Sequence, residues 1–213
     1  MKRTFFTSDH HFGHANILKY EDANRRNAHG GKFASIEKMD EYLIAQWNAT
    51  VATGDLVYCL GDFSFKQSIM ESILPRLHGE KILIVGNHDP FYKRLTQCQG
   101  TKMHNEALAS ALQAGFCEIH MELYVEVSGI GVVRLAHFPY LPAEPLPDYE
   151  QSHAAHWGKP RNEALLLHGH IHSQWQTKIE PDMPPMINVG IDMWNLCPIL
   201  EADIVQKYHE ILL

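Results

Sequence analysis

Residues 5–11 read FFTSDHH, an apolar run that breaks into a polar turn carrying Asp and His. The same arrangement recurs at 57–63 (VYCLGDF), 82–89 (ILIVGNHD), 133–139 (VRLAHFP), 165–172 (LLLHGHIH) and 186–192 (MINVGID). Each apolar run has the length of a buried strand, so the polar residues fall at strand ends, where open α/β sheets place their ligand sites. A single turn of this kind would be an ordinary surface loop, but six of them predict one converging site.

The side chains that these turns would bring together are imidazoles, carboxylates and an amide, which suit divalent metal ions better than a packed core. They are Asp9, His11, Asp62, Asn87, His88, His137, His170 and His172. The two-residue spacing of Asp9 and His11, and of His170 and His172, would place both members on one side of an extended strand end. All of these except His88 are predicted metal ligands.

Seven ligands are too many for one tetrahedral zinc ion and fit two metals about 3.5 to 4 Å apart. The carboxylate of Asp62 is able to bridge two cations. A two-metal site is typical of hydrolysis, because it lowers the pKa of a bridging water and stabilises phosphoryl oxygens.

The chain reads as a mixture of strands and amphipathic helices. Strands are predicted at 2–7, 56–60, 81–85, 122–127, 132–136, 164–167 and 186–189, and helices at 35–50, 68–77 and 105–114. The first half forms β-α-β units, whereas the pair of strands around 128–131 reads as a hairpin. This order predicts a mixed α/β fold, a two-sheet β-sandwich core with helices outside. The polar segment 21–32, with Arg25 and Arg26, reads as a loop.

Length and composition indicate one globular domain over residues 1–213. With 18 Lys and Arg against 25 Asp and Glu, the formal net charge is −7, which argues against a long nucleic acid held by its phosphates. The four cysteines are far apart, which favours reduced thiols. No apolar stretch has membrane-spanning length, and no signal peptide is recognisable. We therefore expect a cytoplasmic protein without membrane contact; its oligomeric state stays open.

With these residues laid out, the chain resembles the calcineurin-like metallophosphoesterase superfamily, from Asp9 to His172. Its closest likeness is to small bacterial and phage members with a S-D-x-H-F-G-H-x-N-I segment, here Ser8 to Ile17, and a V-G-x-D-x-W-N segment, here Val189 to Asn195. The Ser/Thr phosphatase branch carries Gly-Asp-x-x-Asp-Arg-Gly at the second motif, where this chain has GDFSF at 61–65. The resemblance implies a β-sandwich flanked by helices.

The resemblance also assigns roles to individual residues. Asp9, His11, Asp62 and His172 would hold one metal, while Asp62, Asn87, His137 and His170 would hold the other. A hydroxide bridging the metals would be the nucleophile. His88 would be the general acid for the leaving group, with Asp89 orienting it. Manganese is the expected cation, and iron, zinc, nickel or cobalt are alternatives.

Residues just outside the ligand set are candidates for binding substrate. His14 lies past the first motif and would reach a phosphate, or else serve a capping role. Arg25 and Arg26 would bind a second phosphate or a carboxylate, unless they are solvated loop residues. His10 and His168 are expected to be structural, and Asp192 to line the edge of the site.

These features predict a two-metal hydrolase that cleaves a phosphoester bond, monoester or diester, in a small phosphorylated metabolite or nucleotide. One alternative is a phosphodiesterase or nuclease acting on RNA or DNA ends, with Arg25 and Arg26 along its track. Another is a scaffold that keeps the fold without the chemistry.

Overall fold

Two five-stranded sheets form the centre of the computed structural model, which describes residues 2–142 and 157–213. The first sheet has the order β10-β1-β2-β3-β4, formed by β1 (Thr4–Thr7), β2 (Leu56–Cys59), β3 (Glu80–Ile84), β4 (Glu118–His120) and β10 (Ile199–Leu200). The second has the order β5-β6-β7-β9-β8, formed by β5 (Glu122–Val127), β6 (Gly131–Ala136), β7 (Leu165–His168), β8 (Thr177–Lys178) and β9 (Met186–Asn188). The two-sheet mixed α/β fold predicted from the sequence is confirmed.

Strand direction explains why the polar turns gather. Strands β1 to β4 are parallel, and so are β6, β7 and β9, whereas β10, β5 and β8 pair antiparallel at or near the sheet edges. The hairpin of β5 and β6 is confirmed. Because parallel strands end at the same edge, the turns that follow them lie together.

Successive side chains in the strands of the first sheet point to opposite faces and pack into two separate hydrophobic cores. Phe5 of β1 packs with the helices, while its neighbour Phe6 packs between the sheets with Leu135 and Leu167. Both faces of this sheet are therefore covered, which is why its strands read as continuous apolar runs.

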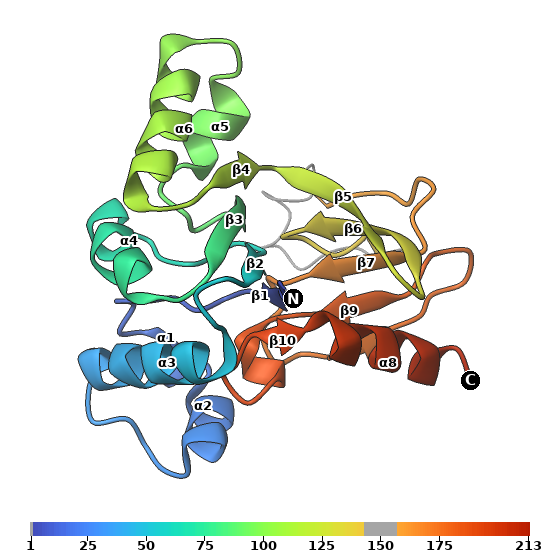
Figure 1. Ribbon diagram of the computed structural model, residues 1–213, viewed down its shortest axis with the longest axis horizontal. Helices are drawn as coiled ribbons and strands as arrows, with labels where there is room; N and C mark the ends of the chain where they lie inside the picture. The colour runs from blue at the N-terminus through green and yellow to red at the C-terminus, as the bar shows by residue number, and fades with distance from the viewer. Residues whose placement is uncertain (1, 143–156) are drawn as a thin grey trace.

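Helices cover the first sheet on the side away from the second sheet, as Figure 1 shows. They are α1 (Ile17–Tyr20), α2 (Asp22–His29), α3 (Ile36–Thr50), α4 (Gln67–Ile73) with the 3-10 turn η1 (Leu74–Arg76), α5 (Tyr92–Gln97) and α6 (Lys102–Ala114). A further 3-10 turn, η3 (Ile191–Met193), precedes β10, and α8 (Glu201–Ile211) packs on the core between the sheets.

Helix starts follow local capping chemistry. The Ser35 hydroxyl accepts the Lys38 N–H at 3.4 Å, so α3 begins where the sequence predicted. Thr101 caps α6 in the same way through His104 N–H, which starts this helix three residues before the predicted Asn105.

Helix α2 corrects the expectation of a loop at 21–32. Its sequence, DANRRNAH, lacks the apolar residues at steps of three and four that predict an amphipathic helix. It is held instead by the buried side chain of Arg25 and ends at Gly30, whose φ of 79° lies in the left-handed region that glycine adopts without strain.

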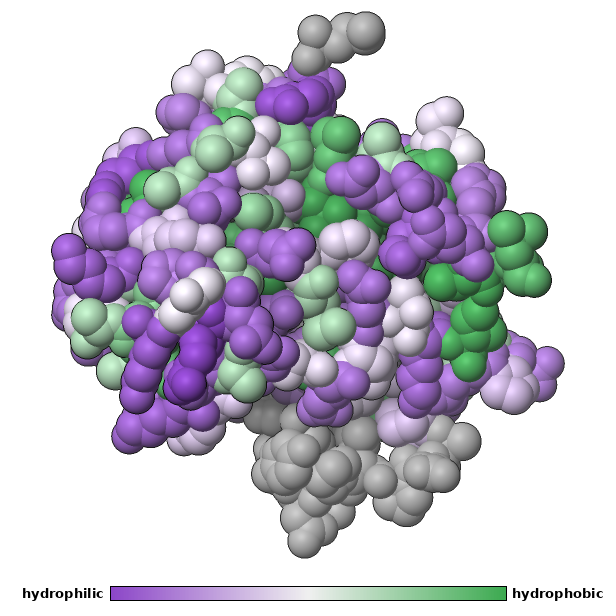
Figure 2. Space-filling view, turned by 90° about the horizontal axis from the view of Figure 1, so that it is seen from below, coloured by the Kyte–Doolittle hydropathy of each residue, from purple (hydrophilic) through white to green (hydrophobic). Residues whose placement is uncertain are grey.

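Figure 2 shows one face covered mainly by hydrophilic residues, with hydrophobic residues in separate patches. No helix within 2–142 or 157–213 combines the length and apolar composition needed to cross a bilayer.

Candidate metal centre

All of the predicted ligands lie in turns at one edge of the two sheets. Asp9 and His11 follow β1, Asp62 follows β2, Asn87 follows β3, His137 follows β6, and His170 and His172 follow β7. Backbone hydrogen bonds join these turns, from Asp9 N–H to Gly61 O at 3.1 Å and from Gly169 N–H to His137 O at 3.0 Å. The sheets thus fix the turns relative to one another.

Potential ligand atoms form two overlapping groups, and within each group the atoms lie within 4.8 Å of one another. The groups are Asp9, His11 and His172, and Asp9, Asp62 and His137. A third cluster completes the set, because Asn87 Oδ1 lies 2.9 Å from His137 Nε2 and 3.1 Å from His170 Nδ1. The structure therefore brings all of the predicted ligands together.

Asp62 lies between two imidazoles. One carboxylate oxygen is 3.5 Å from Nε2 of His137, and the other is 3.7 Å from Nε2 of His11. The first oxygen also accepts the N–H of His88 at 2.9 Å. This is the position expected of a ligand that faces two cations.

The backbone is strained at these ligands. Asp9, His11, Asp62, His170 and His172 have φ values of 60°, 54°, 52°, 73° and 50°, in the left-handed region that costs a non-glycine residue on the order of 1 to 3 kcal/mol. The extended strand end that we expected is therefore wrong, because β1 stops at Thr7 and the pairs converge through left-handed turns. Strain of this kind concentrates at functional sites.

The donor atoms fit divalent cations. Among residues 2–142 and 157–213, neither ring nitrogen of buried His11 has a hydrogen-bond partner, which is costly unless a ligand binds the ring. Nδ1 of His137 donates to the carbonyl oxygen of Leu60 at 2.7 Å, so its Nε2, which faces Asn87 and Asp62, is the nitrogen that would act as a ligand. Mixed nitrogen and oxygen donors suit several first-row divalent metals.

Charge balance points the same way. Burial by itself lowers the pKa of a histidine, but the carboxylates of Asp62 and Asp9 raise the pKa of His137 to about 9. At His172 burial is likewise outweighed by the Asp192 hydrogen bond and the nearby carboxylates, which raise its pKa to about 9. The buried carboxylates require positive charge, which protons or divalent cations would supply.

Asp192 supports His172 from behind and was not recognised as such in the sequence. Its Oδ2 accepts the Nδ1–H of His172 at 3.0 Å, and Arg25 Nε donates to its Oδ1 at 2.8 Å. The side chain of Asp192 is buried, so the expectation that it lines the edge of the site is corrected.

The structure places Arg25 inside the protein, with no exposed surface. Besides Asp192, its guanidinium donates to the carbonyl oxygens of Asp9 at 2.8 Å and His10 at 3.0 Å. Arg25 thus joins the turn after β1 to η3, and the expectation that it binds substrate is corrected. Arg26 is exposed and pairs with Asp22 on the same helix, which gives no support to a substrate role.

His88 is exposed beside the ligands. Its ring stacks on Phe65 with centroids 4.4 Å apart and lies 5.8 Å from the His11 ring. His14 contacts the same Phe65 at 4.2 Å, so one phenyl ring lies between two histidines at the opening of the site. Sequence reasoning missed Phe65, which carried no signal beyond its place three residues after Asp62.

Asp89 does not orient the His88 ring through a hydrogen bond within the described ranges. Its buried carboxylate accepts the N–H groups of Gly86 at 2.8 Å, Phe63 at 2.9 Å and Asp62 at 3.1 Å. Asp89 therefore ties the turn after β3 to the turn after β2, and the expected role is corrected.

The two histidines not expected to be metal ligands, His10 and His168, are both buried. His10 contacts Thr7 Oγ1 at 3.0 Å, and His168 Nδ1 donates to the Gly169 carbonyl at 2.8 Å. Burial lowers the pKa of each to about 3, so both rings are neutral.

Comparisons with known proteins find similar chains in a phage, an archaeon and a bacterium. The protein encoded by gene 66 of Mycobacterium phage L5 is 29% identical over 225 residues, covering 99% of this chain and 97% of that protein. A stretch of 94 residues is 40% identical to an uncharacterised protein of Methanocaldococcus jannaschii, covering 43% of this chain and 49% of that protein. A solved protein of unknown function from Aquifex aeolicus shares the fold, with a TM-score of 0.60 and 22% identity over 97% of this chain and 99% of that one.

The family model for calcineurin-like phosphoesterases matches residues 2–174, which include every predicted ligand. Because this match spans most of the sequence, the chain belongs to the calcineurin-like phosphoesterase family.

Proposed function

We propose that this protein is a metal-dependent phosphoesterase that hydrolyses a small phosphorylated metabolite or nucleotide, either a monoester or a diester. The observation that carries the proposal is the convergence of oxygen and nitrogen donors from separate strand ends, most of them on strained backbone. Two divalent cations, with manganese the first candidate, would activate a water molecule and neutralise phosphoryl oxygens when bound.

The chain's own residues would divide these tasks. Asp9, His11, Asp62 and His172 would hold one cation, and Asp62, Asn87, His137 and His170 the other. His88 would donate a proton to the departing oxygen, since its ring is exposed beside the ligands while its backbone is fixed to Asp62.

The alternatives lose support. A track for RNA or DNA ends relied on Arg25, which is fully buried and occupied by Asp192. A scaffold without chemistry has no need for a complete ligand set or for the backbone strain at its ligands.

Metal removal tests the proposal directly. Chelation should abolish hydrolysis of an aryl phosphate and an aryl diester, and manganese should restore it. In elemental analysis, Asp62→Asn should lose metal at both sites and His11→Ala mainly at one, whereas His209→Ala on exposed α8 should match the wild type. Full activity after stringent metal removal would contradict the proposal.

The role of His88 is tested with a series of leaving groups. His88→Ala should lower the rate about 10² to 10⁴-fold for esters with a strongly basic leaving oxygen and far less for activated aryl esters. Metal content should stay near wild type, because the ligands are untouched. Equal losses across the series would mean that His88 positions the substrate instead of donating a proton.

A further inference from the structure

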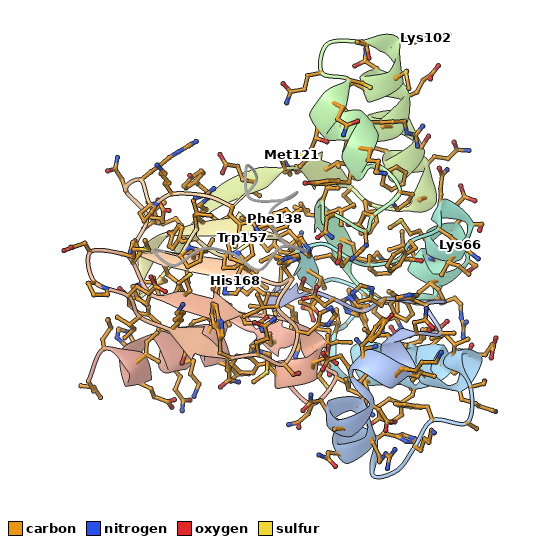
Figure 3. All side chains as sticks on the ribbon, turned by 180° about the vertical axis from the view of Figure 1, so that it is seen from behind. Lys66, Lys102, Met121, Phe138, Trp157 and His168 are labelled. Carbon is orange, nitrogen blue, oxygen red and sulfur yellow. The ribbon has the colours of Figure 1, made fainter. Side chains whose placement is uncertain are left out.

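A cavity of about 380 Å³ opens beside the metal centre, between the end of β6 and residues 157–161. Its wall includes Met121, Phe138 and Trp157, which Figure 3 shows gathered in one region of the molecule. Arg134, Lys159 and Arg161 also line it. Of the residues that line it, only His137 belongs to the proposed ligand set.

The cavity adjoins the ligands. His137 lines it and also approaches Asn87 and Asp62. The rings of Phe138 and Trp157 lie 4.6 Å and 5.7 Å from the ring of His170. A phosphate ester bound at the metal centre would therefore have room to extend along this aromatic wall.

Two buried donors in the cavity wall lack acceptors in the part of the chain that the structure describes. They are Nε of Arg134, a residue only 6% exposed, and Nε1 of Trp157. An unsatisfied buried donor is costly, on the order of 1 to 3 kcal/mol, so such groups usually have a partner or a ligand. The two N–H groups together with the cationic side chains are suited to an anion.

The charge of the cavity differs from that of the whole protein. Arg134, Lys159 and Arg161 face one lining carboxylate, Glu122, which pairs with Arg134 at 2.7 Å and with Arg161 at 3.3 Å. Glu163, behind the wall, lies 3.8 Å from Arg134. Within a chain of net charge −7, the lining of this cavity is therefore positive.

The segment that closes the cavity is fitted closely to Arg134. A Cβ atom at Gly158 would lie 2.4 Å from both terminal nitrogens of the guanidinium, so only glycine allows this approach. The Leu141 N–H donates to Gly158 O at 3.0 Å, and Arg134 Nη1 donates to Lys159 O at 3.0 Å. These contacts hold Trp157 and Lys159 at the cavity.

We propose that this cavity is a second-anion subsite: it binds a phosphate or carboxylate group of the substrate that is not hydrolysed, with an aromatic portion of the substrate against Trp157 and Phe138. The inference rests on the proposed function and names its substrate class, an aromatic phosphate ester that carries a second negative group.

Matched substrates test the subsite. Adenosine 3′,5′-bisphosphate is compared with adenosine 5′-monophosphate, and 4-carboxyphenyl phosphate with phenyl phosphate, which separates a second phosphate from a second carboxylate. In the wild type the second anion should raise kcat/KM about tenfold or more for at least one pair, the gain of a hydrogen bond to a charged group. Arg134→Gln, Trp157→Phe and Lys159→Gln should each bring that ratio towards one.

The three variants guard against a folding defect. Arg134→Gln also removes the ion pair with Glu122, so it could affect folding. Trp157→Phe keeps an aromatic ring at this position, and Lys159 is exposed, so these two variants should fold normally. Lys102→Gln, on α6 at the far end of the molecule in Figure 3, is the charge-matched control and should keep the wild-type ratio. No preference in the wild type, or a preference retained in all three variants, would overturn the subsite.

A binding measurement separates this inference from the proposed function. Calorimetry of adenosine 3′,5′-bisphosphate and 4-carboxyphenyl phosphate with chelator-treated protein should show binding of at least one probe that weakens about tenfold in Arg134→Gln. Such binding, together with no ester hydrolysis by the same protein after manganese is added back, would contradict the phosphoesterase proposal and keep the subsite. If the metal-loaded protein hydrolyses esters but wild type and Arg134→Gln bind both probes equally, the subsite is contradicted and the phosphoesterase proposal stands.

Discussion

Two buried arginines show how differently the same side chain is used. Arg25 has no exposed surface, and its donors reach Asp192 and the carbonyl oxygens of Asp9 and His10. Arg134 is also buried, yet its Nε has no acceptor in the described part of the chain, and the residue lines a cavity. Arg25 joins separate segments of the fold. Arg134 keeps an Nε–H that we propose binds an anion of the substrate.

Burial alone therefore does not identify a functional arginine. What distinguishes the two is the state of their donors, since a buried N–H without an acceptor is costly and a satisfied one is not. We therefore expect Arg25 variants to affect stability and metal binding, and Arg134 variants to affect substrate preference.

The largest effect is expected for Arg25→Ala. Removing one partner of a buried ion pair typically costs about 3 to 5 kcal/mol, and here it would leave the Asp192 carboxylate with only His172 beside it among the described residues. Urea denaturation of the metal-free protein measures this loss. Arg26→Ala, at the exposed neighbouring position, should change stability by less than about 1 kcal/mol. Similar losses in both variants would break the comparison.

A smaller effect is expected for Asp192→Asn. The variant keeps the shape of the side chain but removes the charge that orients His172 and pairs with Arg25. Loss of such a supporting carboxylate typically lowers metal affinity about 10 to 100-fold. A competition titration with a metal-binding dye measures the affinity, and unchanged binding would mean that the backbone alone positions His172.

The smallest effect is expected for Gly158→Ala. The new methyl group would displace the guanidinium of Arg134 from its contacts with Glu122 and Lys159. Because a long side chain can shift without moving the backbone, the cost should be about 1 kcal/mol, the lower limit for an overpacked site. Thermal denaturation measures the cost. The same variant should lose preference for a substrate with a second anion, and a retained preference would show that the guanidinium position is unimportant.

Much of the site was predictable because each ligand follows its own apolar strand. A run such as ILIV at 82–85 specifies a buried strand locally, and the turn after it must then lie at the sheet edge. The hairpin and the Ser35 cap were predictable for the same reason, since neighbouring residues decide them. Helix α2 was not, because its stability depends on a contact between Arg25 and Asp192, 167 residues apart.

Local residue patterns were enough to predict the mixed two-sheet class, the set of candidate ligands and the resemblance to metallophosphoesterases. The three-dimensional fold was needed to show which polar side chains act through others, such as Asp89 through backbone N–H groups and Asp192 through His172. It alone also revealed the cavity beside Arg134 and Trp157. The physical reason is that strand formation follows from nearby residues, whereas burial and the pairing of donors with acceptors depend on segments far apart in the chain.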